Sequence, residues 1–242
     1  MHRLDSLQTS FSHPFLWFQD LAVLSYSDNI AHVVNVDTTS LEGLQRANEL
    51  GLVESGLANV VASPFLAEVA ELFRHKANTG RVFAVLRHPV ESAIAHYLML
   101  RETLPPRQTR LSLFQYAHSP YLIDNFMVKT LINVTDAVVT EDHVEMAKSV
   151  LERFAVVGLW NHLEESMERF YNHFGWTRPE SYNVCQGAFI SVQQYQGSEA
   201  SIEEGSDEYH TMVDRNWADM MLWEEAQRIW DRQGQLTAGV VR

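Results

Sequence analysis

The residues best suited to chemistry lie between Arg87 and Tyr97, directly after an apolar run at residues 82–86. The run does not alternate with polar residues, which is typical of a central strand covered on both faces. Pro89 has a fixed φ and no N–H, so it predicts the first position of a helix. The free N–H groups and the dipole of such a helix start attract an anion, and Arg87 adds a charged fork beside them. This pattern predicts a phosphate site; the alternative is an ordinary βα unit in which Arg87 caps the sheet edge.

The elements that must position this turn alternate along the chain. Apolar runs predict strands at residues 31–37, 59–63, 82–86 and 154–159. Periodic segments predict helices at residues 41–50, 64–75, 89–102, 112–117, from Asn125, 141–153, 161–175 with Asn161 as cap, and 214–233. Residues 1–30 form an irregular N-terminal extension, and residues 177–210 are irregular as well. The alternation predicts the α/β class, as one domain with a mostly parallel sheet flanked by helices.

Composition and charge narrow the class of ligand. The 242-residue chain has a formal net charge of −13, which argues against general binding to nucleic acid, because that requires a basic surface. Seven of its 18 Lys and Arg nevertheless lie between Arg74 and Arg110, where Glu91 and Glu102 are the only acids. A local basic field of this kind indicates a small polyanionic ligand.

The content of cysteine and histidine limits the possible disulfides and metal sites, and the hydropathy limits the possible membrane segments. The single cysteine, Cys185, excludes an intrachain disulfide and a multi-cysteine zinc site. The 11 histidines show no metal-ligand spacing, so no metal is expected. The apolar stretch at residues 14–24 is interrupted by Gln19 and Asp20 and is too short to span a bilayer. We therefore expect no membrane segment in this chain, and with no targeting segment visible its localisation stays open.

The segment from Leu86 to Val90, followed by Tyr97, resembles the 3′-phosphate-binding motif of sulfotransferases, most closely the Golgi carbohydrate (heparan-sulfate) type. Those enzymes transfer a sulfuryl group from 3′-phosphoadenosine 5′-phosphosulfate (PAPS) to a sugar hydroxyl. The resemblance covers residues 31–235 and includes Asn125 to Leu131, which is similar to the family's Asn-x-x-x-Arg-x-Leu segment. It implies a P-loop-like fold, PAPS as nucleotide sulfate donor, a carbohydrate acceptor, and the Golgi lumen or membrane for full-length relatives.

The resemblance also implies site residues. Arg87 matches the arginine that holds the 3′-phosphate, whereas the serine that the family places eight residues later is Ala95 here. Ser92 replaces a second arginine, and we expect its hydroxyl to stand in for the missing serine, one helical turn away. In the Asn-x-x-x-Arg-x-Leu segment, Asn125 is kept and Lys129 replaces the arginine. Lys129 is then a cation near the nucleotide, the alternative being an ordinary surface lysine.

The resemblance further implies a general base near the strand that precedes the phosphate turn, where relatives often have a His or Glu. Residues 60–68 match that region, and Glu68 is their only titratable side chain. Glu68 is thus the candidate catalytic residue, against the commoner alternative of a solvated helix carboxylate.

The family's 5′-phosphosulfate loop, roughly Pro-Lys-Thr-Gly-x-Thr, has no counterpart in the sequence. We therefore expect the first strand and its loop to be missing. Two functions stay open: a sulfotransferase that acts on a carbohydrate hydroxyl, and a truncated or degenerate relative that binds nucleotide weakly or not at all and transfers nothing. Another P-loop-like phosphotransferase is disfavoured, because neither a Walker lysine nor a metal-binding carboxylate pair is evident. The sequence leaves the acceptor open, since acceptor contacts lie on variable loops.

Overall fold

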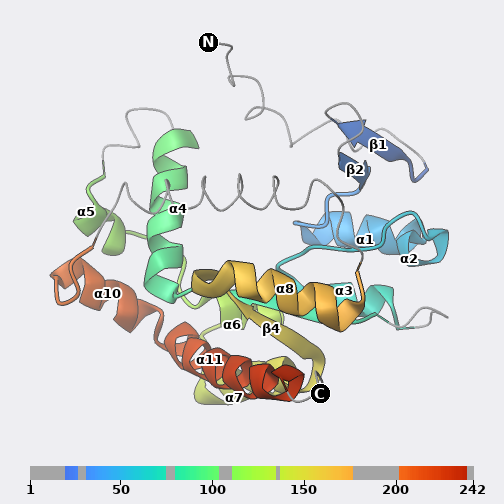
Figure 1. Ribbon diagram of the computed structural model, residues 1–242. Helices are drawn as coiled ribbons and strands as arrows, with labels where there is room; N and C mark the ends of the chain where they lie inside the picture. The colour runs from blue at the N-terminus through green and yellow to red at the C-terminus, as the bar shows by residue number, and fades with distance from the viewer. Residues whose placement is uncertain are drawn as a thin grey trace, which may run out of the picture. The chain divides into compact units, whose positions relative to one another are not determined.

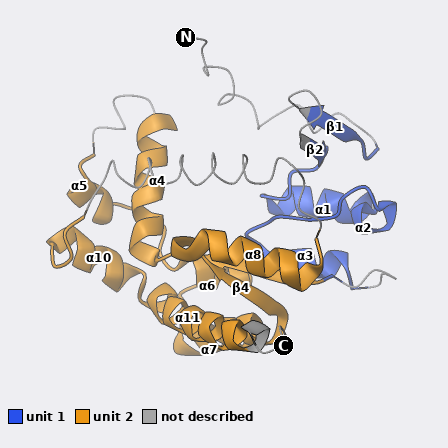
Figure 2. Ribbon diagram, viewed as in Figure 1, with its two compact units in different colours: residues 1–80 blue, residues 81–242 orange. Residues whose placement is uncertain are grey.

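The computed structural model describes residues 20–26, 31–74, 80–103, 111–134, 137–176 and 202–238. The chain forms two compact units, residues 1–80 and residues 81–242, shown in two colours in Figure 2. The boundary between them lies inside the single α/β domain that the sequence predicted over residues 31–235. Most of the predicted extension and of the predicted irregular segment, at residues 1–19, 27–30 and 177–201, lies outside the described residues, as does Cys185.

The first unit contains an antiparallel hairpin of β1 (Val23–Tyr26) and β2 (Ala31–Val34). Fully buried Asn35 closes its open end, because its Oδ1 accepts from the Ala22 N–H at 2.8 Å and its Nδ2 donates to the Asp20 carbonyl at 3.1 Å. This arrangement corrects the predicted membership of residues 31–37 in a parallel sheet. Residues 59–63 also form no strand.

Three helices complete the described part of this unit: α1 (Leu41–Glu49), α2 (Leu52–Ser55) and α3 (Leu66–Leu72). The N–H of Gly43 donates to Ser40 Oγ, which caps α1 as a serine before a helix is expected to do. Gly51 has φ 68°, a left-handed conformation that favours glycine, and it separates α1 from α2. Leu44, Leu52 and Leu72 form the small core between the helices.

The second unit is mixed α/β, built on the parallel pair of β3 (Val82–Leu86) and β4 (Ala155–Leu159). Figure 1 labels β4 of this pair. Both strands were predicted from their apolar runs, and this part of the prediction is confirmed. Their register runs from Val82 opposite Ala155 to Leu86 opposite Leu159. Within the described residues the sheet has two strands, so it is smaller than the sheet that the sequence predicted.

The helices of this unit are α4 (Pro89–Thr103), α5 (Leu113–Ala117), α6 (Phe126–Leu131), α7 (Glu141–Phe154), α8 (Leu163–Phe174), α10 (Asp207–Arg215) and α11 (Trp217–Ala238). Except for α10, they follow the predicted order. Two details differ from the prediction. A 3-10 turn, η2 (Trp160–His162), precedes α8, so Asn161 lies inside that turn and His162 is the residue at the helix start. The predicted closing helix at residues 214–233 is observed as α11. The helix α10 was not predicted, and its first four residues lie in the segment at residues 177–210 that the sequence predicted to be irregular.

Two hydrophobic clusters fix the turn between β3 and α4. The first packs the sheet against α7 and α11 and contains Leu86, Val157 and Leu222. The second joins α4 to α5 and α10 and contains Val90 and Met212. Because the strand ends in one cluster and the helix begins in the other, the backbone of the intervening turn is held from both sides.

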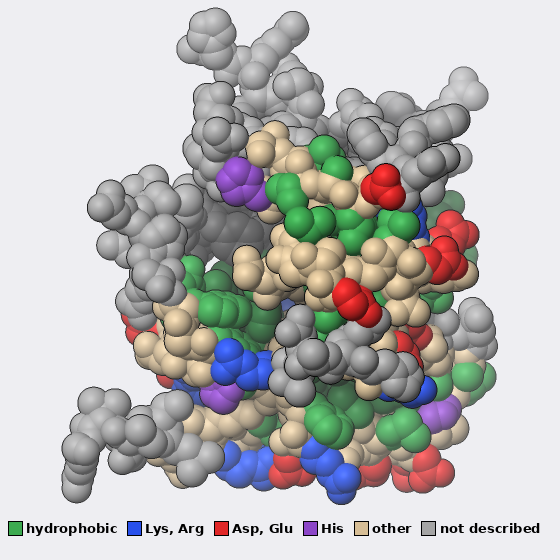
Figure 3. All heavy atoms as spheres, turned by 90° about the vertical axis from the view of Figure 1, so that its right-hand side faces the viewer, with side chains coloured by type: hydrophobic (Ala, Val, Ile, Leu, Met, Phe, Trp, Pro, Cys, Tyr) green, Lys and Arg blue, Asp and Glu red, His purple; other side chains and the backbone are tan. Residues whose placement is uncertain are grey.

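The described surface carries charges of both signs. On the face drawn in Figure 3, acidic and basic side chains are interspersed with hydrophobic ones. None of the helices in the described part of the chain is both long and apolar enough to cross a membrane.

Candidate functional site

Arg87 lies at the carboxyl edge of the parallel pair. Leu86 and Leu159 are paired across the sheet, so Arg87 and Trp160 leave their strands at the same edge. The guanidinium carbon of Arg87 lies 5.3 Å from the centroid of the Trp160 ring. In open α/β sheets, ligands bind in the crevice outside the carboxyl ends of the strands. The edge that carries Arg87 is therefore the first candidate site.

Glu91 is the ionic partner of Arg87. Its Oε2 lies 3.4 Å from Arg87 Nε, and the two side chains are 49% and 25% exposed. An ion pair of this length between partly exposed groups contributes roughly 0–1 kcal/mol. An incoming phosphate can therefore replace Glu91 at little cost.

The helix α4 begins at Pro89, as the sequence predicted. The N–H of Ser92 donates to the carbonyl of His88 at 2.9 Å, so the N–H groups before Ser92 have no acceptor within the helix. The His88 ring packs edge-on against Trp223 at 5.9 Å. Burial lowers the pKa of His88, although Glu91 and Glu204 act in the opposite direction. The neutral ring is thus favoured at neutral pH, and Arg87 supplies the positive charge at this turn.

Ser92 lies half-buried in the first turn of α4. Its hydroxyl has no hydrogen-bond partner among the described residues. It shares this helix start with Arg87, and the structure leaves its predicted role in phosphate binding untested.

Asn125 is a structural link between two helix starts. It has φ 48° and lies immediately before α6, and its Oδ1 accepts from the N–H groups of Ala218 at 2.9 Å and Asp219 at 3.3 Å. Its own N–H donates to Asn216 Oδ1 at 3.0 Å. The side chain is 4% exposed, so its carboxamide oxygen is committed to the first turn of α11.

Asp219, at the start of α11, caps the first turn of α6 in the same way. Its two carboxylate oxygens accept from the N–H groups of Met127 at 2.9 Å and Val128 at 2.8 Å. Burial raises the pKa of Asp219 to about 6, against the opposing effect of these two hydrogen bonds. The two helices therefore cap each other through residues more than 90 positions apart in sequence.

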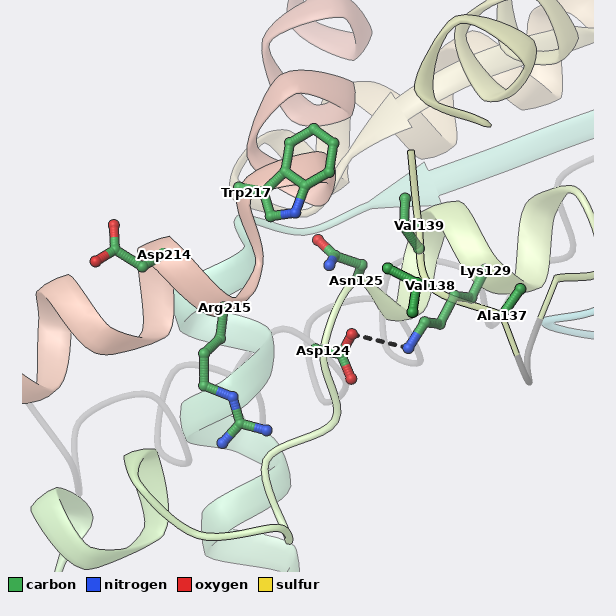
Figure 4. A pocket seen from close by; sticks show the side chains of 9 residues that line it. All are labelled: Asp124, Asn125, Lys129, Ala137, Val138, Val139, Asp214, Arg215 and Trp217. Atoms are coloured by element: carbon green, nitrogen blue, oxygen red, sulfur yellow. Dashed lines mark hydrogen bonds and ion pairs between the residues drawn. The ribbon is translucent and has the colours of Figure 1, made fainter. Parts of the chain in front are cut away.

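A pocket of about 470 Å³ opens beside this junction (Figure 4). Its lining residues are Asp124, Asn125, Lys129, Ala137, Val138, Val139, Asp214, Arg215 and Trp217. The pocket thus brings together two of the predicted site residues, Asn125 and Lys129, and its lining includes neither Arg87 nor Ser92.

Both cations of this pocket have partners. Lys129 Nζ donates to Asp124 Oδ2 at 2.8 Å, and the lysine side chain is 15% exposed. The Arg215 guanidinium donates to the carbonyls of Ala117, Ser119 and Leu122. An ammonium group has three donors, so Lys129 can donate to a ligand while it keeps Asp124.

Glu68 belongs to the first unit, on α3. Its Oε2 is buried and has no hydrogen-bond partner in the described part of the chain. The residue as a whole is half-buried, and the structure leaves both its predicted role as a base and the alternative of a solvated helix carboxylate untested.

Two residues at these sites were missed from the sequence. Trp160 directly follows its strand, as Arg87 follows its own, and this shared position was a signal that the two lie together. Asp219 had no comparable local signal, because its contacts with α6 come from a distant part of the chain.

The described residues contain no group of three or more His, Cys, Asp or Glu side chains that could hold a metal ion. A scan against protein-family models and searches of curated proteins and of solved structures find no match to this chain.

Proposed function

We propose that this protein is a sulfotransferase that binds PAPS and transfers its sulfuryl group to a hydroxyl of a carbohydrate. The observation that carries the proposal is the position of Arg87, at the carboxyl edge of a parallel strand pair and directly before the start of α4. A charged fork beside free helix N–H groups is suited to a phosphate. The resemblance of the surrounding sequence to the family's motif identifies that phosphate as the 3′-phosphate of the donor.

The reaction has one displacement at sulfur. The acceptor hydroxyl oxygen forms a bond to sulfur, the bond from sulfur to the 5′-phosphate oxygen breaks, and a base takes the hydroxyl proton. The products are a carbohydrate sulfate ester and adenosine 3′,5′-bisphosphate. Catalysis of such a transfer depends on holding the donor by its phosphates and on stabilising the leaving oxygen.

Each predicted residue has a part in the proposal. Arg87 exchanges Glu91 for the 3′-phosphate, and the Ser92 hydroxyl donates to the same group. Lys129 supplies a second cation to the nucleotide, while Asn125 fixes the start of α6, from which Lys129 projects. Glu68 stays the candidate base on the resemblance alone, and Glu68→Gln is its test, with loss of transfer and retention of donor binding expected.

The second candidate is a truncated or degenerate relative that binds nucleotide weakly or not at all and transfers nothing. It is favoured by the pairing of both proposed cations with acids, Arg87 with Glu91 and Lys129 with Asp124. A cation that is already paired holds a ligand less tightly than a free one, and the sequence shows no counterpart of the 5′-phosphosulfate loop.

A sulfate-transfer assay separates the two candidates. Labelled PAPS is incubated with the protein and desulfated heparin, and the label in the polysaccharide is counted. Transfer that is lost in Arg87→Ala supports the sulfotransferase. Absence of transfer, together with weak or no binding of adenosine 3′,5′-bisphosphate, supports the second candidate. Arg101→Ala is the matched control, because Arg101 lies at the far end of α4, over the Tyr97 ring.

A further inference from the structure

Trp160 lies beside Arg87 and has no role in the proposed function. The paired ends of β3 and β4 place the two residues at one edge, and the Arg87 guanidinium carbon is 5.3 Å from the centroid of the Trp160 ring. Trp160 as a whole residue is half-buried. Aromatic side chains next to phosphate-binding cations recognise nucleotides, because every base offers a flat face for stacking.

The turn that carries Trp160 is tied to α8 at both of its ends. The N–H of Leu159 donates to Ser166 Oγ at 2.9 Å, and the Ser166 hydroxyl lies 3.0 Å from the Leu159 carbonyl and 2.8 Å from the His162 carbonyl. Ser166 is fully buried. These three contacts enclose η2, so the backbone of Trp160 is held between two fixed points.

The close approach of α8 to β4 depends on Gly158. A Cβ at this position would lie 2.7 Å from the Phe170 ring and 2.9 Å from Ser166 Cβ. Both distances are shorter than packed side chains tolerate. The absence of a side chain at Gly158 therefore lets Ser166 reach the strand and fix the turn. A site held by packing and hydrogen bonds before the ligand arrives loses less entropy on binding.

We propose that Trp160 is a specificity-determining residue that stacks against the base of the nucleotide whose phosphate Arg87 binds. This inference rests on the proposed function and adds the recognition of the base. The bound phosphate takes the place of Glu91 as the partner of Arg87. The base, attached to the same sugar, then lies against the neighbouring indole. The site accordingly selects a nucleotide over a sugar bisphosphate that lacks a base.

The test compares two ligands by calorimetry: adenosine 3′,5′-bisphosphate and 2-deoxyribose 3,5-bisphosphate, which has no base. The wild-type chain is expected to bind the nucleotide about tenfold to a hundredfold more tightly. Trp160→Ala is expected to bring the two affinities together by weakening only the nucleotide, and Trp160→Phe to keep most of the difference. The ratio within one variant is independent of how much of that variant is folded. Trp176→Phe, in the cluster with Phe83 and Phe174, is the control and keeps the wild-type ratio.

The outcomes separate the inference from the proposed function. Equal affinities in the wild type, or an unchanged preference in Trp160→Ala, would overturn the role of Trp160 and leave phosphate binding by Arg87 intact. If the wild type binds neither bisphosphate, both the proposed function and this inference fail.

Discussion

At the scale of single residues, the balance at Arg87 decides whether an anion binds. The guanidinium contacts both the Glu91 carboxylate and the Trp160 ring. The first contact is 3.4 Å long, and the second is 5.3 Å from the guanidinium carbon to the ring centroid, so neither is a tight contact. A phosphate dianion has more charge and better geometry for the fork than Glu91. The ion pair with Glu91 therefore orients Arg87 in the absence of ligand, and a phosphate can displace Glu91 from it.

Glu91→Gln tests this competition. The variant removes the charge that competes with the ligand and repels it, so the affinity for adenosine 3′,5′-bisphosphate is expected to rise about two- to fivefold, the equivalent of a surface ion pair. Titration calorimetry measures it. Glu102→Gln makes the same change of charge at the exposed far end of α4 and serves as control. An equal rise in both variants would mean that only the overall charge matters and that Glu91 has no specific part.

At the scale of elements, α6 and α11 begin at one point and cap each other. Asn125 accepts from the first turn of α11, and Asp219 accepts from the first turn of α6. Removing either side chain leaves buried N–H groups without an acceptor, at a cost of about 1–3 kcal/mol for each group. This junction fixes the start of the helix that carries Lys129, so it supports the pocket as well as the fold.

The titration of Asp219 predicts a measurable pH dependence. Its pKa is about 6 in the folded chain and 3.8 for an unperturbed carboxyl group, so between these values the folded state binds the extra proton. The stabilisation from this proton is complete below the unfolded pKa and is lost as the pH rises through about 6. The difference of about 2 pKa units corresponds to about 3 kcal/mol.

Urea unfolding between pH 4 and pH 7 provides the measurement, with Asp219→Asn as the variant. The difference in unfolding free energy between wild type and variant is expected to shift by about 2 kcal/mol over this range, in favour of the variant as the pH rises. Asp231→Asn, at an exposed position of α11, is the control and should follow the wild type. A difference that stays constant with pH would contradict the raised pKa.

Part of the fold could be predicted from local patterns in the sequence. Residues 82–86 and 155–159 are continuous apolar runs, and they form the buried parallel pair that such runs indicate. Pro89 marks the first residue of α4 through its own chemistry. The hairpin partner of residues 31–34 is close in sequence, at residues 23–26, but it lies in an aromatic-rich stretch without a sustained period and was not predicted. The contacts of Asp219 depend on residues more than 90 positions away, so no local pattern could reveal them.

The candidate site was predictable to a similar degree. Arg87 follows a recognisable strand and precedes a recognisable helix start, so its position at a sheet edge could be foreseen. The sequence could not reveal that Glu91 pairs with it, because an acid one turn along a helix is equally often solvated. Nor could it reveal that the Asn125 side chain caps α11, since that contact spans more than 90 residues.

At the scale of the molecule, all residues proposed to recognise the phosphate and the nucleobase lie in the second unit. Arg87, Ser92 and Trp160 all belong to it, as do both hydrophobic clusters that fix the turn between β3 and α4. The core of this unit is assembled from its own helices and strands.

A fragment of residues 81–242 tests this independence. It is expected to unfold cooperatively and to bind adenosine 3′,5′-bisphosphate with the affinity of the full chain, because its core and the residues proposed to bind the nucleotide are both internal. Circular dichroism on heating follows the folding, and calorimetry follows the binding. A folded fragment that does not bind, beside a full chain that does, would place part of the site in residues 1–80. A fragment that fails to fold would contradict the self-sufficient core.

The most direct test of the central claim is a calorimetric titration of adenosine 3′,5′-bisphosphate into the wild-type chain, Arg87→Lys and Arg87→Ala. The wild type is predicted to bind, and Arg87→Ala to lose about ten- to a hundredfold in affinity, the value of a charged hydrogen-bonded contact. Arg87→Lys falls between them, because lysine keeps the charge and loses the fork. Absence of binding by the wild type at millimolar ligand, or equal binding by wild type and Arg87→Ala, would contradict the assignment of Arg87 as the phosphate-binding residue.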